Sequence, residues 1–144
     1  MSFIVNDESC IALLKQAEAA MGRAYVPYSN FRVGAALVDA QGFVHVGCNI
    51  ENAAYGPTNC AERTALFSAI ARGQKPHSFQ ALAVIGDTSE PISPCGVCRQ
   101  VIIELMDKDT PIILGNLKGD WKVTTAAQLL PDAFVPASLS KEEK

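Results

Sequence analysis

The pattern of apolar and polar positions along the chain predicts alternating helices and strands. Residues 7–21 carry apolar side chains at helical spacing, which predicts an amphipathic helix. Two apolar runs rich in β-formers, residues 31–39 and 43–50, are separated by a Gln-Gly pair and predict an antiparallel hairpin. The almost wholly apolar run 79–86 is typical of a central strand that is buried on both faces.

The second half of the chain predicts two helices that begin at cysteines, followed by another hairpin. The first of these helices follows Cys60 and ends near Gly73, and the second follows Cys95. Strands are expected over residues 111–116 and 121–124, with a short helix after them.

The order helix, strand, strand, helix, strand, helix, strand, strand places the chain in the α/β class. We expect a single-domain, three-layer sandwich with a mixed five-stranded sheet. A right-handed crossover would put both cysteine helices on the same face, with their N-termini at the same edge of the sheet. The folded domain is expected to span residues 1–136, followed by a frayed, charged tail over residues 137–144.

Composition supports one domain and excludes several classes of partner. The chain has 144 residues, of which 49% are hydrophobic, enough for a single sizeable core. A net charge of −3 and the lack of any run of Lys or Arg argue against a nucleic acid polymer as partner. No stretch is apolar over a membrane-spanning length, and the N-terminus has no signal-like segment, which predicts a cytoplasmic protein without a membrane partner.

Three of the five cysteines occur in two motifs that predict a metal site. Cys95 and Cys98 have C-x-x-C spacing, and Cys60 begins another helix; the free N–H groups and the dipole at a helix start favour a thiolate. Three thiolates suit zinc, and three protein ligands rather than four leave a position open for water, as in a catalytic site. Glu62 follows Cys60 by two residues and could exchange protons with whatever that water attacks.

The same residues also allow structural interpretations. Cys95 and Cys98 could be half of a structural zinc knuckle that His77 or Cys48 completes. Glu62 could instead form a capping box in which Asn59 is the N-cap. From these residues alone, both alternatives stay open.

Five segments spread along the chain carry a family resemblance. They are Phe31-Arg32-Val33-Gly34-Ala35-Ala36, Asn49-Ile50-Glu51-Asn52, Cys60-Ala61-Glu62, Pro94-Cys95-Gly96-Val97-Cys98-Arg99-Gln100 and Leu129-Leu130-Pro131. In this order they resemble the zinc-dependent cytidine deaminases, in particular the small homotetrameric type that acts on free nucleosides. The resemblance covers nearly the whole chain and implies a cytidine deaminase-like domain over residues 1–136.

The resemblance implies one zinc ion per chain, with Cys60, Cys95 and Cys98 as its ligands. It implies that zinc lowers the pKa of a water molecule, that the resulting hydroxide attacks C4 of cytosine, and that ammonia and uridine leave. Glu62 would carry protons to ring N3 and to the departing amine. We expect Arg63 to offset the negative charge of the three thiolates.

The resemblance also implies a substrate pocket for free cytidine or deoxycytidine that is shared between subunits of a homotetramer. The implied substrate-binding residues are Asn49 and Glu51 for the ribose hydroxyls, Phe31 and a neighbour's Phe134 for the pyrimidine, Ala61, and Tyr55 in a loop that lines a neighbour's pocket. The alternatives are a deaminase of a related aminated nucleoside, a nucleic-acid deaminase and a structural zinc-binding module.

Overall fold

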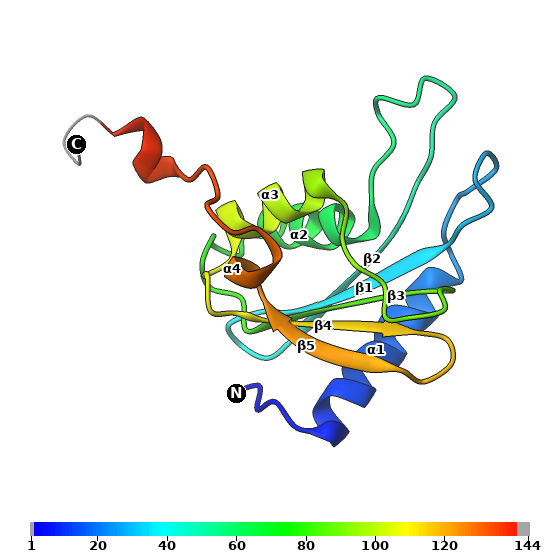
Figure 1. Ribbon diagram of the computed structural model, residues 1–144, viewed down its shortest axis with the longest axis horizontal. Helices are drawn as coiled ribbons and strands as arrows, with labels where there is room; N and C mark the ends of the chain where they lie inside the picture. Colours follow the sequence, from blue (N-terminus) through cyan, green and yellow to red (C-terminus); the bar gives the residue numbers. More distant parts are fainter. Residues whose placement is uncertain (1, 141–144) are drawn as a thin grey trace.

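The computed structural model describes residues 2–140, which form a five-stranded sheet with helices on both faces (Figure 1). In chain order the elements are α1 (Asp7–Met21), β1 (Val33–Val38), β2 (Val44–Cys48), α2 (Ala61–Ala71), β3 (Ala81–Gly86), α3 (Gly96–Leu105), β4 (Pro111–Asn116), β5 (Trp121–Thr125), α4 (Ala126–Leu129) and the 3-10 helix η1 (Pro136–Leu139). The predicted order of elements is confirmed. None of the helices within residues 2–140 has the length and apolar character needed to cross a membrane.

The sheet is mixed, as predicted. Its strands lie in the order β2-β1-β3-β4-β5, and only β3 and β4 pair in parallel, with α3 as the connection between them. The other neighbours pair antiparallel. Every residue of β1 and β3 is buried because these strands lie inside the sheet and are covered on both faces, which explains their continuous apolar runs.

Two hydrophobic cores lie on opposite faces of the sheet and complete the three layers. On one face, α1 contributes residues such as Leu14 and Ala17. On the other face, α2 and α3 contribute residues such as Leu66 and Ile102, and α4 adds Leu129. Figure 1 shows α2, α3 and α4 above the sheet and α1 below it, so both cysteine helices lie on the same face as predicted.

The start of α2 lies directly against the edge strand β2. A Cβ atom at Gly47 would be 2.4 Å from the carbonyl oxygen of Ala61 and 2.6 Å from the backbone nitrogen of Ala65, which is closer than any side chain permits. Glycine at this position therefore allows the first turn of α2 to pack closely against β2. This contact fixes the N-terminus of α2, where Cys60 lies.

Two loops extend from the same end of the sheet, one between α1 and β1 and the other between β2 and α2 (Figure 1). Their backbones are hydrogen-bonded: Tyr25 N–H donates to Asn49 O at 3.0 Å, and Glu51 N–H donates to Tyr25 O at 2.9 Å. Further out, the rings of Tyr28 and Tyr55 meet edge to face with their centroids 6.2 Å apart. The two loops therefore form one continuous wall.

The C-terminal segment differs in part from the prediction. Instead of a frayed tail from Ala137, Pro136–Leu139 forms a 3-10 helix. The Ser138 hydroxyl accepts a hydrogen bond from Val135 N–H at 3.3 Å and closes this turn. The end of the predicted charged tail, residues 141–144, lies outside the described residues.

Candidate active site

Three thiol groups meet where two helices begin on the same face of the sheet. Cys60 is the N-cap of α2, Cys95 is the N-cap of α3, and Cys98 lies in the first turn of α3; we call these three residues the cysteine cluster. Their sulfur atoms all lie within 4.8 Å of one another, and Cys60 Sγ is 3.8 Å from Cys95 Sγ. Two sulfurs at about 2.3 Å from one tetrahedral zinc ion would be separated by about 3.8 Å. The donor set and this separation therefore fit zinc.

The sulfur atoms of the cluster carry charge unequally. A hydrogen bond from Cys98, together with one from Arg63, lowers the pKa of Cys60 to about 5 although partial burial opposes this. The hydrogen bond to Cys60 and burial both raise the pKa of Cys98. The backbone N–H of Cys98 donates to Cys95 Sγ at 3.5 Å. Cys60 and Cys98 thus share a hydrogen-bonded proton, which a bound metal ion would displace.

Arg63 lies beside the cluster, where the predicted charge-offsetting role requires it. Its Nη2 donates to Cys60 Sγ at 3.2 Å. Its Nε is buried and has no hydrogen-bond partner among residues 2–140. A guanidinium in this position stabilises negative charge on the sulfur atoms, and two helix N-termini act in the same direction.

Glu62 lies in the first turn of α2 and is only 4% exposed. Burial, with the nearby Cys60 as a smaller cause, raises its pKa to about 7. A carboxyl group with this pKa can both accept and donate a proton near neutral pH.

The capping box that we considered for Glu62 is wrong. Cys60, not Asn59, is the N-cap of α2. Asn59 is instead held in a β-bridge with Ile50, through two backbone hydrogen bonds of 2.9 Å each. Its side-chain Nδ2 donates to Thr64 Oγ1 at 3.1 Å. Glu62 therefore does not form a capping box with Asn59.

The closed, four-ligand alternative does not form either. Within residues 2–140 the cysteine cluster is the one group of three or more potential ligand side chains brought together, and it does not include Cys48. His77 is about half exposed, and its Nδ1 lies 3.2 Å from Asp107 Oδ1. This pair lines a cavity of about 670 Å³ beyond the end of α3, to which no residue of the cysteine cluster contributes. Among the described residues, the fold therefore brings together three potential metal ligands and no fourth.

A second set of polar groups lies between the two protruding loops, around a cavity of about 370 Å³. Its lining residues are Tyr28, Ser29, Glu51, Tyr55 and Thr58. The Oε1 atom of Glu51 accepts hydrogen bonds from Tyr28 N–H at 3.0 Å and Ser29 N–H at 3.1 Å, and its Oε2 atom accepts one from the Ser29 hydroxyl. The Ser29 hydroxyl is the main reason that the pKa of Glu51 is lowered. Glu51 is therefore a negatively charged group of this wall.

Asn49 lies just beyond the end of β2 and holds the same wall from the strand side. Its Nδ2 donates to Phe31 O at 2.7 Å, and its Oδ1 accepts from Val33 N–H at 2.9 Å. The Phe31 side chain is 40% exposed, with the tip of its ring near Gly86. The side chains of Asn49 and Glu51 therefore hold the backbone of residues 28–33, the segment that includes Phe31, and the roles of these residues in substrate binding stay predictions.

The sequence matches the model of a known family, described as "Cytidine and deoxycytidylate deaminase zinc-binding region", over residues 7–114. The chain belongs to this deaminase family. A cytidine deaminase from Sporosarcina psychrophila is 55% identical over 128 residues, which cover 89% of this chain and 93% of the relative. One from Halalkalibacterium halodurans is 52% identical over 128 residues, which cover 89% and 96%. The crystal structure of a cytidine deaminase from Burkholderia pseudomallei matches with a TM-score of 0.85 and 56% identity, covering 90% of this chain and all of that one.

The predicted resemblance is therefore confirmed, and the chain is a zinc-dependent deaminase. The fold comparison agrees with the observed mixed sheet and its helices. The family model matched is that of a zinc-binding region, and it includes all three residues of the cysteine cluster.

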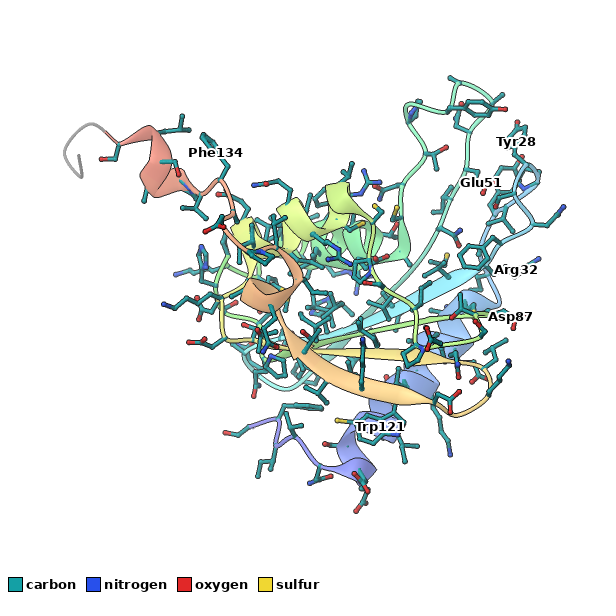
Figure 2. All side chains as sticks on the ribbon, in the orientation of Figure 1. Tyr28, Arg32, Glu51, Asp87, Trp121 and Phe134 are labelled. Atoms are coloured by element: carbon teal, nitrogen blue, oxygen red, sulfur yellow. The ribbon has the colours of Figure 1, made fainter. Side chains whose placement is uncertain are left out.

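Of the other residues that the resemblance assigns to the deaminase pocket, Tyr55 lines the cavity beside Glu51, whereas Phe134 and Ala61 lie elsewhere. Tyr55 is 72% exposed in its loop, and Phe134 is 59% exposed. Figure 2 shows Phe134 at the opposite end of the molecule from Glu51 and Tyr28. Ala61 is fully buried at the start of α2. Phe134 therefore cannot face the Glu51 of its own chain.

Two residues of the deaminase motif in α3, Arg99 and Gln100, make contacts that the sequence did not reveal. Arg99 Nε donates to Pro94 O at 2.8 Å, and its Nη1 donates to Leu129 O at 2.6 Å. Gln100 Nε2 donates to Phe134 O at 2.8 Å. The helix that carries the second cysteine motif is thereby tied to the C-terminal segment. No local pattern signals the bonds to Leu129 and Phe134, because these partners are 30 and 34 residues away along the chain.

Proposed function

We propose that this deaminase hydrolyses free cytidine and deoxycytidine to uridine and deoxyuridine, with release of ammonia. The observation that carries the proposal is the cysteine cluster at two helix N-termini with the buried carboxyl group of Glu62 beside it. Relatives at 52–55% identity that are named cytidine deaminases support this substrate.

In the proposed mechanism, Cys60, Cys95 and Cys98 hold one zinc ion per chain. When bound, zinc supplies a water molecule whose pKa is low enough for attack on C4 of cytosine near neutral pH. Glu62 accepts a proton from the attacking water and delivers it to N3 of the ring. Glu62 then moves the remaining hydroxyl proton to the amino group, the C4–N bond breaks, and ammonia leaves. Arg63 stabilises the negative charge of the sulfur atoms throughout.

We assign the ribose hydroxyls to Asn49 and Glu51, and the face of the pyrimidine to Phe31. Their shared wall between the two loops supports the assignment, as does the charge of Glu51, since a carboxylate accepts hydrogen bonds from hydroxyl groups. A contribution of Ala61 to substrate binding stays a prediction, since this residue is fully buried.

Free nucleosides are expected to be used far better than CMP or dCMP. A 5′-phosphate would bring about two negative charges toward a wall whose charged group, Glu51, is an anion. At the distances inside one pocket this repulsion should lower kcat/KM on the order of 10–100-fold. Ammonia release from cytidine, deoxycytidine, CMP and single-stranded DNA, with zinc quantified in the same sample, measures this.

The role of Glu51 in this preference has a matched control. Glu51→Gln should raise KM for cytidine and leave the zinc content unchanged, because the lost contact is to sugar and not to metal. Glu18→Gln, an exposed change in α1 on the opposite face of the sheet, should alter neither. Equal use of cytidine and CMP would contradict the nucleoside assignment, and turnover of single-stranded DNA would favour a nucleic-acid deaminase.

We also propose a homotetramer in which neighbours complete each other's active sites. The exposed Tyr55 and Phe134 support this, because apolar rings are left in water and Phe134 lies far from the pocket wall of its own chain (Figure 2). Light scattering should give a mass of about four chains of 15.4 kDa each. A monomer with full activity at the assay concentration would contradict this.

Subunit mixing tests whether Phe134 acts on a neighbour. Glu62→Gln subunits lack the proton carrier but still supply Phe134, whereas Phe134→Ala subunits keep Glu62. Coexpression of the two should give more activity than either variant alone. Leu139→Ala, which removes an exposed side chain from the same segment, should be active by itself. No gain on mixing would place Phe134 outside the shared site.

The location and the boundaries of the enzyme are likewise proposals. All five cysteines of the chain are free, and three thiols in contact stay reduced most readily in the cytoplasm, where we place the protein. We propose that the catalytic domain ends near residue 136, and that neither nucleic acid polymers nor membranes are partners.

A further inference from the structure

The Ser29 hydroxyl joins the two residues that we assign to the sugar and the base. It donates a hydrogen bond to Glu51 Oε2 and accepts one from Phe31 N–H at 3.0 Å. A serine hydroxyl has a single hydrogen to donate, so that hydrogen is used on Glu51. Because Ser29 is exposed, water could satisfy its hydroxyl, and burial does not force this pairing.

The bonds from this loop determine which lone pairs of Glu51 remain available. Oε1 already receives the backbone N–H groups of Tyr28 and Ser29. A carboxylate offers about four lone-pair positions, so the three bonds leave one free position, on the Oε2 atom that the Ser29 hydroxyl holds. That position can accept one hydroxyl hydrogen, as a ribose would provide.

Phe31 is held at both of its backbone polar groups by side chains of this wall. Its N–H donates to the Ser29 hydroxyl, and its carbonyl oxygen accepts from Asn49 Nδ2 at 2.7 Å. Phe31 is 40% exposed, so its ring has few packing neighbours to hold it. The backbone that carries the ring therefore has a large part in setting its position. Ser29 and Asn49 together therefore set where the Phe31 ring lies.

We propose that Ser29 is a positioning residue of the deaminase: its hydroxyl orients Glu51 toward the sugar and Phe31 toward the base. The inference rests on the proposed function, because both of these residues are assigned there to substrate contact. Ser29 thereby sets the affinity for the nucleoside without touching the carbon at which the reaction occurs.

The change Ser29→Ala is expected to raise KM for cytidine about tenfold, with kcat within about twofold and zinc content unchanged. KM should rise by about this much because the variant loses a hydrogen bond to a charged acceptor. The value of kcat should stay nearly unchanged because the lost bond affects substrate binding and not the chemical step. Ser29→Thr keeps the hydroxyl and should restore KM to within about threefold of the wild type. Ser78→Ala, which removes a hydroxyl that bonds Lys75 O at 2.6 Å in a distant loop, should leave KM unchanged.

A double substitution separates positioning from a general effect on the loop. In a Glu51→Gln background, Ser29→Ala should raise KM by only about threefold or less, because the main partner of the hydroxyl is already changed. A tenfold effect in both backgrounds would overturn the inference. So would a Ser29→Ala enzyme in which kcat, zinc content and Tm all fall, since that result assigns Ser29 a structural role.

Assays of the wild-type enzyme separate a failure of the proposed function from a failure of the positioning role. Zinc-loaded wild type that releases no ammonia from cytidine would refute the proposed function. Active wild type together with an unchanged KM for Ser29→Ala would refute the positioning role alone.

Discussion

Replacing Glu62 by Gln is expected to lower kcat for cytidine by about 10²–10⁴ or more, while the protein still folds and still binds zinc. General acid–base catalysis typically contributes a factor of this size, and Glu62 performs more than one proton transfer in the proposed cycle. Glutamine has nearly the same shape as the buried glutamate but cannot take up and release a proton. Steady-state kinetics, with zinc content and Tm measured on the same preparation, checks this.

The control for this prediction is another glutamate, Glu104, which lies in the last turn of α3, at the opposite end of this helix from Cys95 and Cys98. Glu104 lies on the exposed side of α3, and Glu104→Gln should keep kcat within about twofold of the wild type. A Glu62→Gln enzyme with near-normal kcat would show that this carboxyl group has only a structural role at the start of α2.

Replacing Cys95 by Ala is expected to remove most of the zinc from the purified, dialysed protein. In the proposed site Cys95 supplies one of three sulfur ligands, and two protein ligands rarely retain zinc when a competing chelator is present. Activity should fall together with zinc content. Atomic emission measurements of zinc per chain, before and after dialysis against a chelator, provide the test.

Cys48→Ala is the matched control, because Cys48 is a half-buried cysteine outside the cysteine cluster. It should retain one zinc per chain. Wild-type zinc content in Cys95→Ala would mean that Cys95 is not a ligand. Zinc loss in Cys48→Ala alone would mean that Cys48 is a ligand instead.

The helices, the strands and the cysteine cluster could be predicted because their signals are local. Residues 111–116 form β4 as predicted, since Ile112, Ile113 and Leu114 fill the buried centre of the sheet and are apolar without interruption. The cluster could be predicted from the C-x-x-C spacing and two helix starts, and the crossover topology then brings the distant cysteine into contact.

The Asn59 cap, which was the alternative interpretation of this helix start, does not form, and the reason is physical. Asn is a better N-cap than Cys by local preference. The backbone of Asn59, however, is held in a β-bridge with Ile50, so the helix can begin only at Cys60. A tertiary contact thus overrides the local preference, and it also leaves Glu62 free for chemistry.

The contacts within the wall formed by the two loops could not be predicted from local patterns. Ser29 and Glu51 are 22 residues apart, and their bonds depend on how two irregular loops pack against each other. Loop conformations leave no periodic pattern in a sequence, so only the residue types of the motif could be assigned from it, not their partners.

The claim that this protein is a zinc-dependent cytidine deaminase is tested most directly by titrating the metal-free protein with zinc while ammonia release from cytidine is recorded. Activity should rise in proportion to added zinc and stop rising at one equivalent per chain, and Glu62→Gln titrated in the same way should bind the metal without gaining activity. Full activity without metal, or zinc binding at one equivalent with no ammonia released by the wild type, would contradict the assignment.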